Sequence, residues 1–164
     1  MTRTTGLFAA LTFTTVLGAF IPVPASAQDA TAQAAYRDIE QTLGRVPGFF
    51  KAFPEAGIAG AWAEFKSVQL NPKTSLDGKT KELIGLAVAA QIPCQYCVYF
   101  HTAAAKANGA TDEDIRETVA MAAIVRHWST VLNGMQVDLE GFKNETDTVL
   151  RLAGEKAKTV GKAQ

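Results

Sequence analysis

The chain has 164 residues, of which 48% are hydrophobic and 20% charged, a composition that fits a folded core and excludes an intrinsically disordered protein. The 16 lysines and arginines balance 16 aspartates and glutamates, so the basic excess that nucleic-acid binding needs is missing and we expect no nucleic-acid partner. Two cysteines exclude a scaffold built from several disulfides, and their spacing of three residues becomes the main question.

The first 27 residues are typical of a secretory signal peptide. Arg3 gives a basic start, Leu7 to Ile21 is apolar, and Ala25-Ser26-Ala27 matches the small-x-small cleavage pattern. An uncleaved anchor is the alternative, but the apolar stretch is near the lower limit for spanning a bilayer, and Pro22 and Pro24 interrupt its end. We expect cleavage near Ala27, which leaves 137 residues as a single domain, periplasmic or secreted, where disulfides persist.

The rest of the chain shows helical periodicity and no alternating strand pattern, internal repeat or low-complexity linker. The first half is predicted to contain a helix over 29–43 stopped by Gly44, a turn over 46–50 with two aromatics, a helix from Pro54 to about Leu70, and a loop over 75–78. The second half is predicted to contain a buried helix over 79–90, a helix over 94–108 stopped by Gly109, a helix from a Thr111 cap to about Gly134, and an amphipathic segment over 137–153.

The predicted class is therefore all-α. An N-terminal helical segment over 28–75 precedes a core over 76–155, which contains both cysteines. A polar tail over 156–164 is expected to fray.

One segment carries the candidate chemistry. Cys94, Cys97 and His101 stand at i, i+3 and i+7, so one helix places all three on the same face. Cys94 is expected in the first turn, where free N–H groups and the positive end of the helix dipole favour a thiolate. His101 can accept or return a proton beside Cys97. The pattern favours a redox-active thiol pair.

A structural disulfide is the alternative interpretation of the cysteine pair. Closing a four-residue loop would stabilise the fold by only about 2 kcal/mol, against about 3 kcal/mol for a fifteen-residue loop. On an ideal helix the two Cβ atoms would also start about 5–6 Å apart, so the bond is expected to distort the turn. Redox activity is therefore favoured over a stabilising role.

Zinc and haem are less favoured. Cys94, Cys97, His101 and His127 could supply a Cys₂His₂ set, but three ligands on successive turns of one helix depart from the usual turn-borne zinc site. Val98, and not a histidine, follows Cys97, which argues against covalent haem attachment. We expect neither a metal nor a cofactor. His127 is interpreted as an ordinary, partly buried histidine, and three aromatic residues are interpreted as packing residues: Tyr96, Tyr99 and Phe100.

Glu82 lies twelve residues before Cys94, in the first turns of the predicted buried helix. If the helices on either side of Pro93 fold back on one another, this carboxylate can approach His101. Alternatively, Glu82 only complements the helix dipole near its N-terminus. Spacing alone leaves both interpretations open.

Glu82, eleven residues and then Cys94-x-x-Cys97-x-x-x-His101 resembles the active-site pattern of the alkylhydroperoxidase D-like (AhpD-like) branch of the carboxymuconolactone decarboxylase family. The segments 79–84 (KTKELI) and 108–115 (NGATDEDI) look like the same family, and the similarity covers roughly 77–131. The segment 46–50 is similar to that of some small members. Gln95 and Tyr96 stand where the best-known members have a histidine inside the Cys-x-x-Cys.

The resemblance implies an all-helical AhpD-like fold, assembly as trimers or larger homo-oligomers, and thiol-dependent reduction of a hydroperoxide or disulfide substrate. By position, Cys97 would attack the peroxide, Cys94 would resolve the intermediate, and Glu82 and His101 would form a proton relay. The export signal implies a thiol reductant other than the cytosolic donors of the family. Two other interpretations stay open: an oligomeric binding or scaffold protein with a structural disulfide, and a cofactor-free lyase or isomerase that acts through Glu82 and His101.

Overall fold

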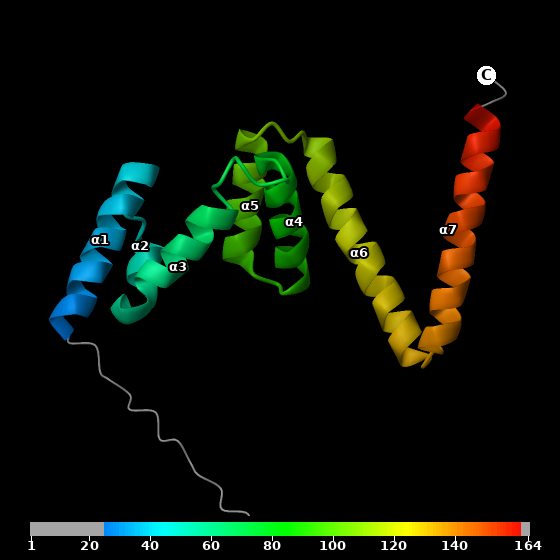
Figure 1. Ribbon diagram of the computed structural model, residues 1–164, viewed down its shortest axis with the longest axis horizontal. Helices are drawn as coiled ribbons and strands as arrows, with labels where there is room; N and C mark the ends of the chain where they lie inside the picture. Colours follow the sequence, from blue (N-terminus) through cyan, green and yellow to red (C-terminus); the bar gives the residue numbers. More distant parts are fainter. Residues whose placement is uncertain (1–24, 162–164) are drawn as a thin grey trace, which may run out of the picture. The chain divides into compact units, whose positions relative to one another are not determined.

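The computed structural model describes residues 25–161 of the chain. Over this range every regular element is an α-helix, which confirms the predicted all-α class (Figure 1). The predicted signal peptide lies outside the described residues up to residue 24, and its last three residues belong to the first helix. None of the helices described over 25–161 combines the length and the apolar character that a bilayer span requires.

The described chain forms two compact units, one up to Lys66 and one from Ser67. The sequence predicted a single domain with an N-terminal segment over 28–75, and the division between the two units lies inside one of the helices. The first unit contains three helices: α1 (Ala25–Leu43), α2 (Gly48–Lys51) and most of α3 (Glu55–Val68).

The first unit is built around aliphatic and aromatic side chains. Ile39 and Ile58 are completely buried, and the ring of Phe50 packs edge-on against Trp62 with the centroids 5.5 Å apart. α1 ends where predicted, because Gly44 adopts the left-handed φ of +79° that favours glycine. The prediction of a turn over 46–50 is partly wrong, since α2 begins inside this segment and buries Phe50.

The second unit holds the residues of the candidate site. Its helices are α4 (Gly78–Gln91), α5 (Gln95–Ala107), α6 (Asp112–Gly134) and α7 (Leu139–Gly161). α4 packs against both α5 and α6, and it buries Leu86. Asp77 caps α4 by accepting a hydrogen bond from the Thr80 backbone N–H at 2.7 Å, and Gly109, with φ of +86°, follows the end of α5.

The α4 helix is less buried than its apolar sequence predicted. Glu82, Leu86 and Ala89 are buried along one face, but Ile84 and Val88 are about half exposed, at 49% and 53%. The prediction of a helix is correct and the prediction of burial on all sides is wrong. The apolar residues form a helix here because most of them are good helix formers, whereas burial requires partners that α5 and α6 supply on only part of the surface.

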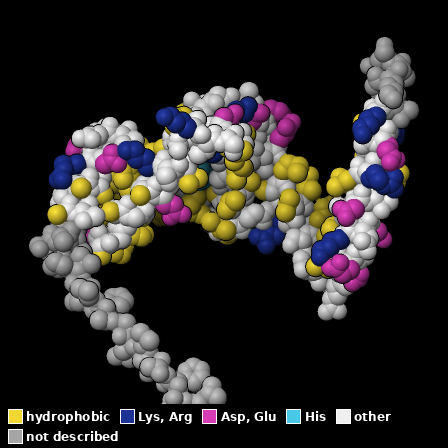
Figure 2. Space-filling model, viewed as in Figure 1, with side chains coloured by type: hydrophobic (Ala, Val, Ile, Leu, Met, Phe, Trp, Pro, Cys, Tyr) yellow, Lys and Arg dark blue, Asp and Glu magenta, His cyan; other side chains and the backbone are white. Residues whose placement is uncertain are grey.

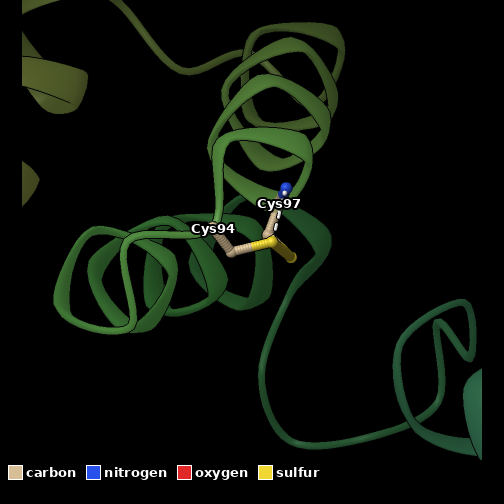
Figure 3. The surroundings of a disulfide bond; sticks show 2 residues. All are labelled: Cys94 and Cys97. Atoms are coloured by element: carbon tan, nitrogen blue, oxygen red, sulfur yellow. Dashed lines mark hydrogen bonds between the residues drawn. A yellow bond between two sulfur atoms is a disulfide. The ribbon is translucent and has the colours of Figure 1, made fainter.

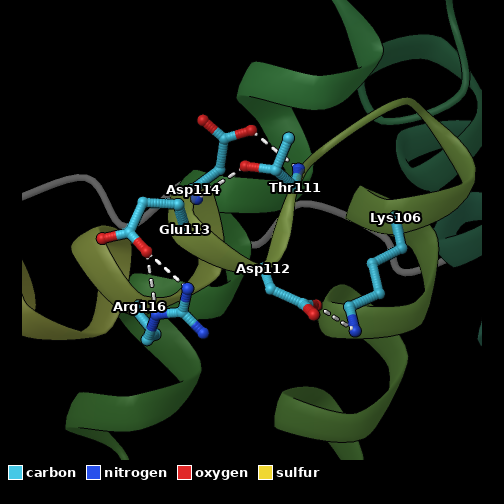
Figure 4. Close-up of polar contacts among 6 residues, drawn as sticks. All are labelled: Lys106, Thr111, Asp112, Glu113, Asp114 and Arg116. Atoms are coloured by element: carbon cyan, nitrogen blue, oxygen red, sulfur yellow. Dashed lines mark hydrogen bonds and ion pairs between the residues drawn. The ribbon is translucent and has the colours of Figure 1, made fainter.

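The predicted start of α6 is confirmed in detail. Thr111 accepts a hydrogen bond from the Asp114 backbone N–H, and the Asp114 carboxylate accepts one from the Thr111 N–H at 2.8 Å, which makes a capping box (Figure 4). Lys106 near the end of α5 pairs with Asp112 at 2.6 Å across the same turn. α7 extends to Gly161, so the tail that was expected to fray from Lys156 is helical over 156–161.

Candidate active site

The cysteine pair lies at the start of α5 and forms a disulfide (Figure 3). The Cα atoms of Cys94 and Cys97 are 5.3 Å apart, inside the range usual for disulfides. Cys94 has extended backbone angles and is the N-cap residue, while Cys97 belongs to the first turn. The helix therefore starts one residue later than the sequence indicated, and the bond joins the N-cap residue to the first turn.

The N-cap position gives the Cys94 sulfur a defined partner. Its Sγ accepts a hydrogen bond from the Cys97 backbone N–H at 3.2 Å, the role that an oxygen plays in an ordinary N-cap. Free N–H groups and the positive end of the helix dipole stabilise negative charge on sulfur at such a position. Both cysteine residues are half-buried, so part of the pair's surface is exposed to solvent.

Glu82 and His101 meet between α4 and α5. The Glu82 Oε2 atom lies 2.7 Å from His101 Nδ1, the carboxylate residue is only 4% exposed, and the imidazole side chain is 19% exposed. The fold-back at Pro93 thus brings together the two residues whose approach the sequence left open. His101 follows Cys97 by four residues on α5, one helical turn further along the same face.

Two residues of this arrangement were missed from the sequence. The Gln69 side-chain amide, just after α3, donates to Glu82 Oε1 at 3.1 Å and lies 3.4 Å from Oε2. Gly85, on α4, faces the imidazole so closely that a Cβ atom there would overlap the His101 ring. No local pattern marks Gln69, whereas Gly85 stands three residues after Glu82, a spacing that places both on one helix face.

The remaining candidates differ in exposure and in whether they contact this arrangement. His127, interpreted as partly buried, is exposed on α6 with its ring edge-on to Trp128 at 5.3 Å, so that interpretation is wrong. Tyr96 and Tyr99 are 79% exposed rather than packed. Phe100 does contact the site, because its ring lies edge-on to His101 at 5.2 Å. Within residues 25–161 no group of three or more histidine, cysteine, aspartate or glutamate side chains is arranged to hold a metal ion.

The chain is similar to known proteins in sequence and in fold. Residues 56–140 match the model of the carboxymuconolactone decarboxylase family. The structure is similar to the crystal structure of the alkylhydroperoxidase AhpD core from Rhodospirillum rubrum, with a TM-score of 0.61 and 27% sequence identity over 77% of this chain and 97% of that one. Over 52 residues the chain is 42% identical to uncharacterized protein 4 in the cox locus of Paracoccus denitrificans, and it spans about half, 47%, of that protein's length.

The family match covers more than half of the chain and includes Glu82, both cysteines and His101. Together with the fold, it supports a peroxidase-like function or one of the carboxymuconolactone decarboxylase type. The chain belongs to the carboxymuconolactone decarboxylase family, as an AhpD-like member.

Proposed function

We propose that the protein is a thiol-dependent peroxidase or disulfide oxidoreductase that cycles between a Cys94–Cys97 disulfide and the two thiols. The observation that carries the proposal is the disulfide at the N-terminus of α5, with His101 one turn further along that helix and paired with Glu82 of α4. A disulfide that closes so short a loop contributes little to stability, and its half-buried position leaves it accessible to a second thiol or a peroxide.

The peroxidase cycle balances with one hydroperoxide and one dithiol. The Cys97 thiolate attacks the peroxide, the O–O bond breaks, and the alkoxide leaves as an alcohol after taking a proton from His101. The resulting sulfenic acid condenses with the Cys94 thiol, which releases water and forms the disulfide. An external dithiol then reduces the disulfide by thiol exchange and is itself oxidised. Glu82 orients His101 and balances its charge when the ring is protonated.

The decisive experiment measures hydroperoxide consumption by the purified protein with dithiothreitol as the reductant. Cys97→Ser and Cys94→Ser should each reduce the rate to that of the reaction without protein, because either change prevents the disulfide cycle. His101→Gln should slow the reaction. The matched control is His127→Gln, which changes the chain's other histidine, exposed on α6, and it should leave the rate unchanged.

Other results would assign a different function. A rate unaffected by both cysteine substitutions would contradict the thiol cycle. An activity on a small organic acid that survives both substitutions but needs Glu82 and His101 would identify a lyase or isomerase of the decarboxylase type. A disulfide that resists mild dithiol, and whose loss changes only the melting temperature, would identify a binding or scaffold protein.

The proposal extends to location and partners. The signal-like sequence over 1–27 supports export to the periplasm or the exterior, where a thiol reductant of that compartment would have to return electrons to Cys94 and Cys97. Exposed apolar side chains on α4 and α6 support self-association into a homo-oligomer.

A further inference from the structure

We infer that Gln69 is a positioning residue that holds Glu82 so that His101 keeps its proton on Nδ1 and presents Nε2 to the thiol pair. The inference rests on the proposed function and extends it to a residue outside the Glu82, Cys94, Cys97 and His101 set. It starts from the three side chains that meet in a row, Gln69 to Glu82 to His101.

The chemistry of the three groups fixes which atom donates. With Glu82 as a carboxylate, its oxygens only accept hydrogen bonds, so both contacts to it come from donors. The Gln69 amide nitrogen supplies one, at 3.1 Å from Oε1. The other has to be the His101 Nδ1–H, at 2.7 Å from Oε2. In the neutral ring Nε2 is then the nitrogen without a proton, and it alone can take one from a thiol.

Gln69 is itself held in place by the segment that follows α3. The Asn71 carbonyl oxygen, two residues later, accepts hydrogen bonds from the Lys81 Nζ at 2.7 Å and from the Thr74 hydroxyl at 3.1 Å. The Asn71 side chain in turn accepts one from the Lys73 backbone N–H at 2.9 Å. Because Lys81 precedes Glu82 on α4, the segment is tied to α4 beside the carboxylate it serves.

The geometry requires a second donor on this carboxylate. Glu82 is the only buried charged residue in the part of the chain that the structure describes, and a buried carboxylate is stable only when its oxygens are hydrogen-bonded. Without Gln69, the group would depend on His101 alone and could rotate about its terminal torsion, which is soft. The ring of His101 would then lose the contact that selects its tautomer.

The test is nitrogen NMR of the oxidised protein labelled with ¹⁵N-histidine, at alkaline pH where neutral imidazole is populated. The chain contains only two histidines, and exposed His127 provides an internal reference in every spectrum. In the wild-type protein His101 should show the Nδ1–H tautomer. His127, which is exposed, should show a mixture of the Nδ1–H and Nε2–H tautomers. In Gln69→Met the Nδ1–H fraction of His101 should fall toward that of His127.

Two further variants complete the experiment. Gln69→Leu removes the polar atoms of the side chain altogether, and it should shift the tautomer as Gln69→Met does. Gln41→Met, on the exposed face of α1, is the matched control and should change nothing. An unchanged His101 tautomer in either folded Gln69 variant, with folding checked by circular dichroism, would overturn the inference.

The rate measurement separates this inference from the proposed function. Gln69→Met should lower kcat for hydroperoxide by about tenfold, as expected for losing one hydrogen bond to a charged group, and leave KM unchanged. If the tautomer shifts but the wild-type protein consumes no peroxide, the proposed function fails and the role of Gln69 stands. If cysteine-dependent peroxidase activity is present and the tautomer does not shift, only the role of Gln69 fails.

Discussion

At the scale of single residues, the space beside His101 is as important as the groups that bind it. Gly85 lies where the imidazole approaches α4, and any side chain there would occupy part of the volume of the ring. The hydrogen bond between Glu82 and His101 depends on this approach, since both helices contribute one partner. A glycine inside a helix lowers stability by about 0.5–1 kcal/mol relative to alanine. The close contact with His101 explains why a glycine is present in spite of this loss.

Gly85→Ala should therefore lower peroxidase activity strongly while leaving the protein folded. Its Cβ would push the His101 ring away from α4 and separate Nδ1 from Glu82, even though alanine is the better helix former. The control is Gly60→Ala on α3, where a Cβ meets nothing within 4 Å, and it should raise the melting temperature slightly without affecting the rate. Steady-state peroxide kinetics and thermal melts check both, and full activity in Gly85→Ala would contradict the proposed role of the close contact.

The candidate site could be predicted only in part from the sequence. Cys94, Cys97 and His101 were found because they lie within one helix and its N-cap, where spacing alone determines which residues are neighbours. Glu82 was singled out by its place before Pro93, and its contact with His101 stayed open because it depends on how two helices fold back. Gln69 could not be found, since its contact crosses an irregular segment whose path no periodicity encodes.

At the scale of elements, one carboxylate at the junction between α5 and α6 stabilises both the start of α6 and its packing against α4. Asp114 completes the capping box with Thr111 and also pairs with Lys79 of α4 at 2.7 Å. The hydrogen bond from Lys79, and those from Thr111, lower the pKa of Asp114 to about 2. One side chain therefore starts α6 and fastens it to α4.

Asp114→Asn should lower the melting temperature at pH 7, and the difference from wild type should vanish on acidification. A carboxyl whose pKa is lower in the folded state contributes stability above its unfolded value, near 3.8, and loses it as the pH falls through about 2. Thermal melts at pH 7, 4 and 2 measure the change. Asp147→Asn, the same substitution on the exposed surface of α7, is the control. A deficit for Asp114→Asn that is equal at pH 7 and pH 2 would contradict this assignment.

Helix boundaries could be predicted from the sequence where capping residues determine them. The burial of helix faces could not be predicted in this way. The Thr111 cap and the Gly44 stop gave correct helix ends because cap chemistry is local. The exposure of Ile84 and Val88 on α4 was not predicted, because apolar composition reports a preference for burial and not the presence of a partner. α2 was missed because its four residues are too few to show a period.

At the scale of the whole molecule, α6 exposes an apolar stripe at the spacing of a helix–helix contact. The stripe consists of four residues at i, i+3, i+4 and i+7, each about half exposed or more: Met121, Ile124, Val125 and Trp128. Figure 2 shows hydrophobic side chains open on the surface of α6. Contiguous apolar surface of this kind marks an interaction site, and a chain with balanced charge offers little repulsion to a second copy.

A self-associating protein should therefore become monomeric when this stripe is charged. Ile124→Glu places a carboxylate in the middle of the stripe, where pairing with another apolar surface would bury an unpaired charge. Ala123→Glu introduces the same charge away from the stripe and should leave the oligomer intact, because Ala123 points at least about 100° around the helix from every residue of the stripe. Sedimentation velocity across a range of protein concentrations distinguishes the two. If wild type and Ile124→Glu sediment alike, the stripe does not mediate association. If both variants dissociate the oligomer, the interface extends around α6 beyond the stripe.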